Sequence, residues 1–115
     1  MAKYERHLNG NFNELLTWLH NDITGGSMSA TYEDGSNTAA GQVKLAVRVY
    51  ERYSMMGGNR VSLNITLLGD GDKLFVSAIT SGGSKAVFFK INTIGEGTFL
   101  EQCSNSVERY ISQRR

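Results

Sequence analysis

Basic residues recur at every fourth position within residues 42–53. Lys44, Arg48 and Arg52 follow this spacing, and Tyr50 has the same parity. In an extended strand these side chains share one face, because successive residues point to opposite sides of the backbone. Cations beside an aromatic ring bind anionic groups through charge-assisted hydrogen bonds and stacking. The pattern therefore predicts a basic surface that accepts an anion.

Residues 60–68 carry polar side chains that extend this surface. Arg60 and Asn64 lie on the polar side of a regular alternation with apolar residues. If the two segments are neighbouring strands, these side chains join the first row. The alternative is a solvated sheet face whose charges are partly neutralised by Glu33 and Glu51. The predicted ligand-binding residues are Lys44, Arg48, Tyr50, Arg52, Arg60 and Asn64.

Groups that perform acid-base or nucleophilic catalysis are few. The two histidines, His7 and His20, have no sequence neighbour that suggests a catalytic triad, and solvated surface positions are favoured for both. Cys103 lies on an apolar stripe, which favours a buried thiol over a nucleophile. One cysteine and two histidines in different segments do not give the ligand spacing of a zinc site. The sequence therefore predicts no catalytic residue, no metal ligand and no cofactor.

Glycine-rich segments raise the question of a phosphate-binding loop. Residues 81–84 lead into an apolar, extended run, so the helix N-terminus that such a loop requires is missing. Residues 95–98 do open a helix, but they lack the third glycine of a dinucleotide fingerprint and the lysine of a P-loop. Turn formation is the favoured interpretation of both segments.

Charge and cysteine content limit the class of protein. Twelve Lys and Arg residues stand against 11 Asp and Glu residues, which gives a formal net charge of +1. This balance argues against nucleic acid or an anionic membrane as a partner. No stretch approaches the roughly 18 apolar residues of a membrane span, and a single cysteine is typical of a reducing compartment. We expect one cytoplasmic domain over residues 1–115.

Two apolar stripes with helical spacing predict two helices, which must pack against the strands that carry these residues. The first follows Asn11 and Glu14, which match a capping box, and ends at the pair Gly25 and Gly26. The second follows another capping-box match at Thr98. The stripe residues are Phe12, Leu15, Leu16, Leu19 and Ile23 in the first helix, and Phe99, Leu100, Cys103, Val107, Tyr110 and Ile111 in the second.

Between the helices the hydrophobic period changes to two, which indicates strands. The chain has 13 glycines and no proline, so glycine must make the turns, and Asp34-Gly35 is predicted to be one of them. The expected strands are residues 3–9, 28–33, 42–53, 60–68, 73–80 and, in a sixth segment, 86–91. The expected inward residues of the two longest strands are Val43, Leu45, Val47, Val49, Val61, Leu63, Ile65 and Leu67.

The in/out alternation predicts an antiparallel sheet with one apolar face, which both helices cover. The fold class is therefore α+β, a two-layer domain with five or six strands and the order β-α-β-β-β-β-(β)-α. This order resembles the helix-grip and TATA-binding-protein-like folds, in which a curved sheet wraps a terminal helix. The likeness concerns topology only and implies no function.

The text of three segments also resembles a known family. The segments MAKYERHLNGNFNELL, VRVYERYSMMGGNRVSLN and LFVSAITSGGSKAVFFKIN are similar to short bacterial proteins that are classified only as a domain of unknown function. The resemblance extends over most of the chain. It implies a bacterial, cytoplasmic protein and supplies no catalytic residue.

Two functions from different classes remain after these exclusions. The first is a non-enzymatic module that binds a small anionic or amphipathic ligand, either between sheet and helix or on the basic sheet face. The alternative is a self-associating or protein-partner-binding domain, because residues 86–91 are apolar on both faces and would seek another strand or subunit if exposed. An enzyme is the least favoured class.

Overall fold

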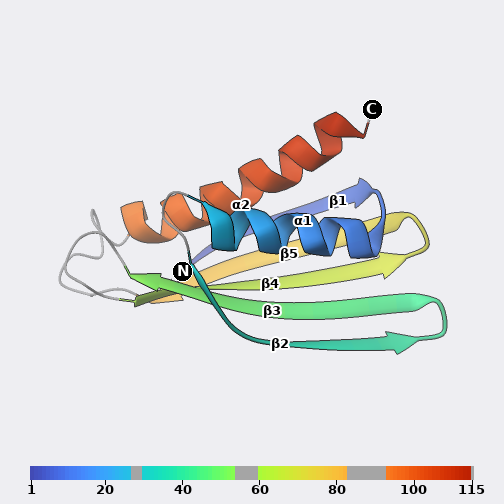
Figure 1. The fold of residues 1–115 in the computed structure, drawn as a ribbon, viewed down its shortest axis with the longest axis horizontal. Coiled ribbons are helices and arrows are strands. Elements are labelled where there is room, and N and C mark those ends of the chain that lie inside the picture. The colour runs from blue at the N-terminus through green and yellow to red at the C-terminus, as the bar shows by residue number, and fades with distance from the viewer. Residues whose placement is uncertain (27–29, 54–59, 83–92, 115) are drawn as a thin grey trace.

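The computed structural model describes residues 1–26, 30–53, 60–82 and 93–114, with the backbone alone for residues 93–98. It contains one antiparallel sheet and two helices (Figure 1). The elements in chain order are β1 (Ala2–Asn9), α1 (Phe12–Gly25), β2 (Thr31–Ala40), β3 (Val43–Tyr53), β4 (Arg60–Asp70), β5 (Lys73–Gly82) and α2 (Thr93–Gln113). The predicted fold class and element order are confirmed. The predicted sixth strand, residues 86–91, lies outside the described residues.

The strand order in the sheet is β1-β5-β4-β3-β2, so β4 is the central strand. All neighbouring pairs are antiparallel. The edge strands β1 and β2 run in the same direction, and α1 crosses the sheet to connect them (Figure 1). Two-residue turns join β2 to β3 and β4 to β5, and each begins with a glycine, Gly41 or Gly71, at φ +61°. A positive φ at the first turn residue alone is the type II′ pattern that suits twisted hairpins.

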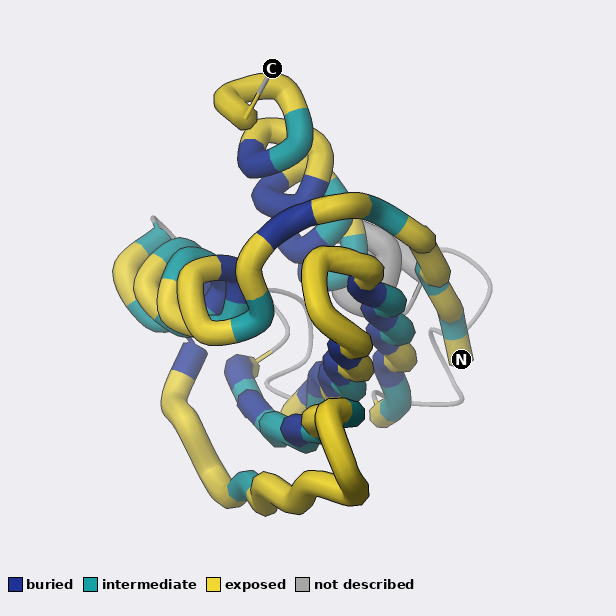
Figure 2. The backbone as a smooth tube through the Cα atoms, turned by 90° about the vertical axis from the view of Figure 1, so that its right-hand side faces the viewer, coloured by how far each residue is buried: buried dark blue, intermediate teal, exposed yellow. Residues whose placement is uncertain are grey.

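Both helices lie on one side of the sheet, as the sequence predicted. We call this the helix side, and the opposite face the open side. The core fills the space between the helices and the central strands, and Leu15 and Leu19 of α1 meet Leu63 and Val76 there, all nearly inaccessible to solvent. In the end-on view of Figure 2 the buried residues gather between helices and sheet, whereas β2 is exposed almost throughout.

The start of α1 agrees with its predicted cap. The Asn11 side chain accepts a hydrogen bond of 2.9 Å from the backbone N–H of Glu14, which satisfies one of the free donors at a helix start. The predicted start of α2 at Thr98 is wrong, since the helix begins at Thr93. It continues through Gly95 and Gly97, although each glycine costs about 1 kcal/mol relative to alanine in a helix.

The predicted turn at Asp34-Gly35 is also wrong. Both residues lie inside β2, which continues to Ala40. The register with β3 shifts between Tyr32 and Asp34, which leaves Glu33 as the extra residue of a bulge. Gly35 allows the β3 backbone and the Tyr32 side chain to approach β2 closely at this position, because a Cβ there would lie 2.7 Å from both the Val47 carbonyl oxygen and the Tyr32 hydroxyl. A glycine inside a strand can thus mark a bulge instead of a hairpin turn.

The inward face predicted for β3 is inverted. Ala46, Tyr50 and Arg52 are its buried residues, whereas Leu45 and Val47 lie on the open side. The central strand β4 has the predicted orientation, with Val61, Leu63, Ile65 and Leu67 buried. Even-numbered β3 residues therefore pair with odd-numbered β4 residues, and a register shift of one residue moves a whole strand face to the other side.

Candidate functional site

The register separates the six predicted ligand-binding residues onto two faces. Directly paired residues of antiparallel strands point to the same side, so Tyr50 lies beside the buried Leu63, and Asn64 lies beside Val49 on the open side. The prediction of one continuous basic face is therefore wrong. The helix side carries Lys44, Arg48, Tyr50 and Arg52, and the open side carries Arg60 and Asn64.

Arg60 is neutralised by neighbouring carboxylates. Its guanidinium lies 2.6 Å from a carboxylate oxygen of Glu51 and 3.9 Å from one of Glu33, and 5.6 Å from the ring centre of Tyr53. This is the arrangement that the alternative interpretation of the sequence expected. Asn64 is exposed on the same face and stands between Val49 and Ile79. The open side therefore offers no unneutralised cation at these two positions.

Arg52 is buried beneath α2. Only 8% of its surface is exposed, and its guanidinium lies 4.4 Å from the ring centre of Phe99. It donates a 3.3 Å hydrogen bond to the side-chain oxygen of Gln102, whose amide nitrogen in turn donates to the carbonyl of Asp22. Burial lowers the pKa of Arg52. This arginine connects β3 to both helices, so its contacts indicate a structural role.

Tyr50 belongs to an aromatic cluster between α1 and the β2–β3 hairpin. Its hydroxyl and Nδ1 of His20 are hydrogen-bonded at 3.0 Å, and the rings of His20 and Tyr32 lie 5.6 Å apart, edge to face. Burial raises the pKa of Tyr50 to about 12, so the phenol is neutral near pH 7. The sequence had favoured a solvated His20, and that prediction is wrong.

Lys44 and Arg48 differ from the other basic residues of the predicted set. The Arg48 guanidinium donates hydrogen bonds of 2.7 Å to the Asn37 side chain, 2.9 Å to the Val47 carbonyl and 3.4 Å to the Ser36 carbonyl. The Lys44 ammonium lies 5.9 Å from the ring centre of Phe12. Within the described part of the chain, neither cation forms an ion pair with a carboxylate.

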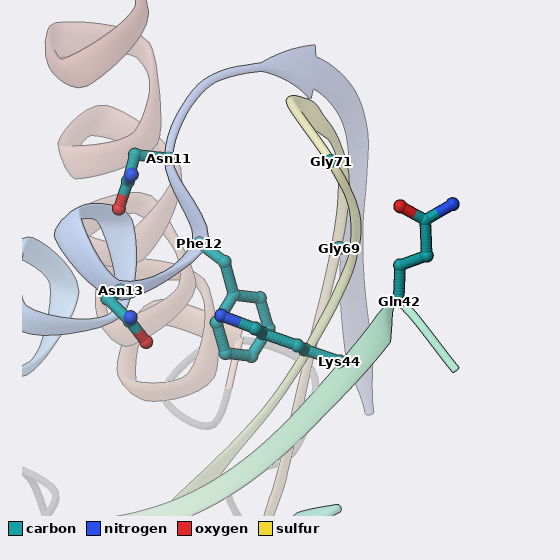
Figure 3. A pocket seen from close by; sticks show the side chains of 7 residues that line it. All are labelled: Asn11, Phe12, Asn13, Gln42, Lys44, Gly69 and Gly71. Atoms are coloured by element: carbon teal, nitrogen blue, oxygen red, sulfur yellow. The ribbon is translucent and has the colours of Figure 1, made fainter. Parts of the chain in front are cut away.

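A pocket of about 160 Å³ opens beside Lys44, where the first turn of α1 faces the ends of β3 and β4 (Figure 3). Lys44 extends across the Phe12 ring toward the start of the helix. Gly69 allows Phe12 to lie close against β4, because a Cβ there would approach the Phe12 ring to 2.8 Å. The pocket is lined by Asn11, Phe12, Asn13, Gln42, Lys44, Gly69 and Gly71.

The chemistry of this site is electrostatic and aromatic. In the pocket, Lys44 supplies positive charge, Phe12 supplies ring surface and Asn13 supplies an amide. Further along the hairpin on the same face, Arg48 adds a second cation and the partly exposed Tyr32 adds another ring. Sequence reasoning found the two cations but missed Phe12, Tyr32 and His20. Only the eight-residue spacing of Phe12 and His20, about two helical turns along one side of α1, could have suggested the pair.

Other reactive groups do not form a site in the described residues. Cys103 is buried, and burial raises the pKa of its thiol to about 12, so the thiolate is scarce near neutral pH. No group of three or more His, Cys, Asp or Glu side chains within residues 1–26, 30–53, 60–82 and 93–114 is arranged to hold a metal ion. In the same part of the chain, no helix is long and apolar enough to span a membrane.

Comparison with known families gives one result. The model of a family of unknown function, DUF6054, matches residues 1–111. The chain belongs to this family. The match confirms the resemblance to a domain of unknown function. It includes all five strands, α1, and α2 except for its last residues. A search among curated proteins found no matching relative. The family therefore assigns no role to Lys44, Arg48 or any other residue.

Proposed function

We propose that this protein is a non-enzymatic module that binds a small amphipathic anion on the helix side of the β2–β3 hairpin. The observation that carries the proposal is the pair Lys44 and Arg48, two cations on one face of β3 with no carboxylate partner among the described residues. Lys44 also lines a pocket with an aromatic wall. Surface cations in a protein of balanced charge are often paired, so two unpaired ones on one face favour an external anion.

The size of the pocket constrains the ligand. A volume of about 160 Å³ is below the range of roughly 300–1,000 Å³ that encloses a drug-sized molecule. It holds a carboxylate or phosphate group with a few waters or carbons. Four strand residues span about 13 Å, so a ligand whose head group lies at Lys44 reaches Arg48 with an extended body of that length. The ligand body then lies on the hairpin toward Tyr32, a residue that is 46% exposed.

The setting of this function is part of the same proposal. A bacterial cytoplasm agrees with a chain whose one cysteine, Cys103, is buried as a free thiol. In that compartment, metabolites with one carboxylate or phosphate and an apolar chain are the class of ligand that the pocket favours. The absence of a paired nucleophile and base around the described pocket residues supports binding without catalysis.

The test is a titration with matched alkyl probes. Octyl phosphate and octanoate carry the predicted head groups, and octylamine has the same chain with the opposite charge. We expect the two anions to shift the amide NMR signals of residues 11–13 and 42–48 in a saturable way, and octylamine to leave them unchanged. Loss of two charge-assisted contacts, at about 1.5 kcal/mol each, predicts about a hundredfold weaker binding for the variant Lys44→Gln, Arg48→Gln.

The matched control removes a lysine of the open side. Lys73 is exposed at the start of β5 and does not line the pocket. Lys73→Gln lowers the net charge of the protein by one unit without changing the site, so it separates a local effect from a general one. Equal weakening by the control and by the single variant Lys44→Gln contradicts the proposal, and so does saturable binding of octylamine with the same affinity as the anions.

A further inference from the structure

The open side of the sheet presents apolar side chains that no described element covers. Leu68 of β4 and Ile79 of β5 are each 38% exposed, and β3 contributes a row of partly buried residues to the same side. Both helices lie on the opposite side (Figures 1 and 2). The apolar residues of the open side are Val43, Leu45, Val47, Val49, Leu68, Phe75 and Ile79.

The register arranges these residues in rows across the sheet. Leu45 pairs with Leu68, and Leu68 pairs with Phe75, which gives one apolar row over three strands. Two residues further along each strand, Val47 and Ser77 flank Thr66 of β4. Two residues further again, Val49 and Ile79 flank Asn64 as a second apolar pair. The rows are centred on β4, the middle strand of the sheet.

We infer that this face packs against the same face of a second copy of the chain, about a two-fold axis parallel to β4. Such an axis places β4 on its own counterpart, β5 on β3 and β1 on β2 of the other copy, because the strand order is symmetric about β4. Leu68 then meets Leu68 of the second copy. Phe75 meets Leu45, and Ile79 meets Val49. Each of these last two contacts occurs twice in the dimer.

Charge at the two edges of the sheet favours this arrangement. Lys3 of β1 pairs with Ile79, and Asp34 of β2 pairs with Val49, so the two charges end the same row at opposite edges. The two-fold axis brings Lys3 to Asp34 of the second copy, and the reciprocal pair forms as well. Neither residue has an ion-pair partner within the described part of its own chain. The interface therefore gains two complementary contacts at its rim. The axis also brings Asp70, at the end of β4, toward Asp70 of the second copy, where Lys73 on the neighbouring strand supplies a positive charge beside each carboxylate.

The area of the face is sufficient for a stable dimer. Five strands at about 4.8 Å spacing and nine residues at about 3.3 Å give roughly 700 Å² on each copy. Specific interfaces bury about 800 Å² on each partner. Face-to-face sheets keep their strand directions within about 30° of each other, which holds the central rows over one another. This surface is separate from the pocket beside Lys44, so the inference does not depend on the proposed ligand.

Sedimentation velocity across the micromolar range tests the inference. We expect the unaltered protein to form dimers, and Leu68→Lys to raise the dimer Kd at least a hundredfold by placing two ammonium groups against each other at the axis. Leu68 is partly exposed in the single chain, so this variant is expected to fold, which circular dichroism checks. Thr17→Lys, on the exposed face of α1, is the matched control and should leave the dimer unchanged.

A charge exchange tests the predicted axis. Lys3→Glu and Asp34→Lys should each raise the dimer Kd about tenfold, and the double variant should recover the original Kd, because the pair is restored with reversed charges. A wild-type protein that stays monomeric throughout the micromolar range overturns the inference. A dimer that Leu68→Lys leaves intact overturns it too. A double variant no tighter than the single ones overturns the two-fold pairing.

Discussion

Arg48 and Arg52 lie on the same side of β3 in different surroundings. Arg48 bonds to exposed groups of the hairpin, whereas Arg52 is enclosed by Phe99 and Gln102. Replacement of Arg52 by Gln should lower the free energy of unfolding by about 2 kcal/mol, because a stacked, hydrogen-bonded side chain is removed from a buried position. Replacement of Arg48 by Gln should lower it by less than about 1 kcal/mol. Urea unfolding followed by Trp18 fluorescence measures both, and equal losses contradict the assignment.

Cys103 and Tyr50 predict how stability responds to alkaline pH. Burial raises the pKa of each to about 12, from ordinary values of 9.0 and 10.0. A raised pKa means that the folded state favours the neutral form, so the associated stability is complete below pH 9 and is lost as pH rises toward 12. We expect the urea midpoint to fall over this window, and less steeply in Cys103→Ala. An unchanged slope in that variant contradicts the prediction, as does rapid reaction of the native thiol with a disulfide reagent at pH 8.

At the scale of single elements, the β2–β3 hairpin depends on the conformation of its first turn residue. Gly41 has φ +61°, which residues with a Cβ rarely adopt. Gly41→Val should therefore destabilise the protein by about 1–2 kcal/mol. Gly25, at the end of α1, has no strained φ and open space around its Cα, so Gly25→Ala should stabilise by up to about 1 kcal/mol. Thermal unfolding compares the two variants, and a harmless Gly41→Val contradicts the turn geometry.

The helices and the central strand were predictable because their burial is one-sided and strong. The stripe of Leu15, Leu19 and Ile23 is fully enclosed, and β4 alternates as its sequence indicates. β3 was predicted with the wrong face because valine favours an extended backbone whichever side of the sheet it points to. Its valines therefore indicate a strand but not which face of that strand is buried. The structure places the stems of Arg48 and Arg52 on the helix side instead, where long side chains cover apolar surface with their methylene groups.

The site was predictable in its charges and not in its assembly. Lys44 and Arg48 were predicted to share one face of one strand, which depends only on the alternation of side chains along that strand, and the structure confirms this. The neighbours of these cations come from α1 and from β2. β2 contains a bulge at Glu33, which the sequence pattern did not predict. Contacts such as Phe12 against Gly69 require the tertiary arrangement, since the two residues are far apart in sequence.

At the scale of the whole molecule, one sheet separates two surfaces with different chemistry. The helix side combines a core with the cationic rim formed by Lys44 and Arg48, and the open side combines apolar rows with charged ends. Residues that alternate along β3 supply both surfaces, so neighbours in sequence contribute to opposite faces. The layer between them is close-packed backbone and side chain, and a substitution on one side reaches the other only through a change in the sheet itself.

This separation predicts that ligand binding and dimer formation vary independently. Leu68→Lys should bind octyl phosphate with the Kd of the unaltered protein, although it is monomeric. The variant Lys44→Gln, Arg48→Gln should dimerise normally, although it binds the probe weakly. Leu68 is bonded to Gly69, which pairs with Lys44, but the side chains of Leu68 and Lys44 point to opposite faces of the sheet. The combined variant should therefore show both defects with no interaction energy beyond about 0.5 kcal/mol. A larger interaction energy means that the sheet transmits strain between its faces, which contradicts a rigid layer.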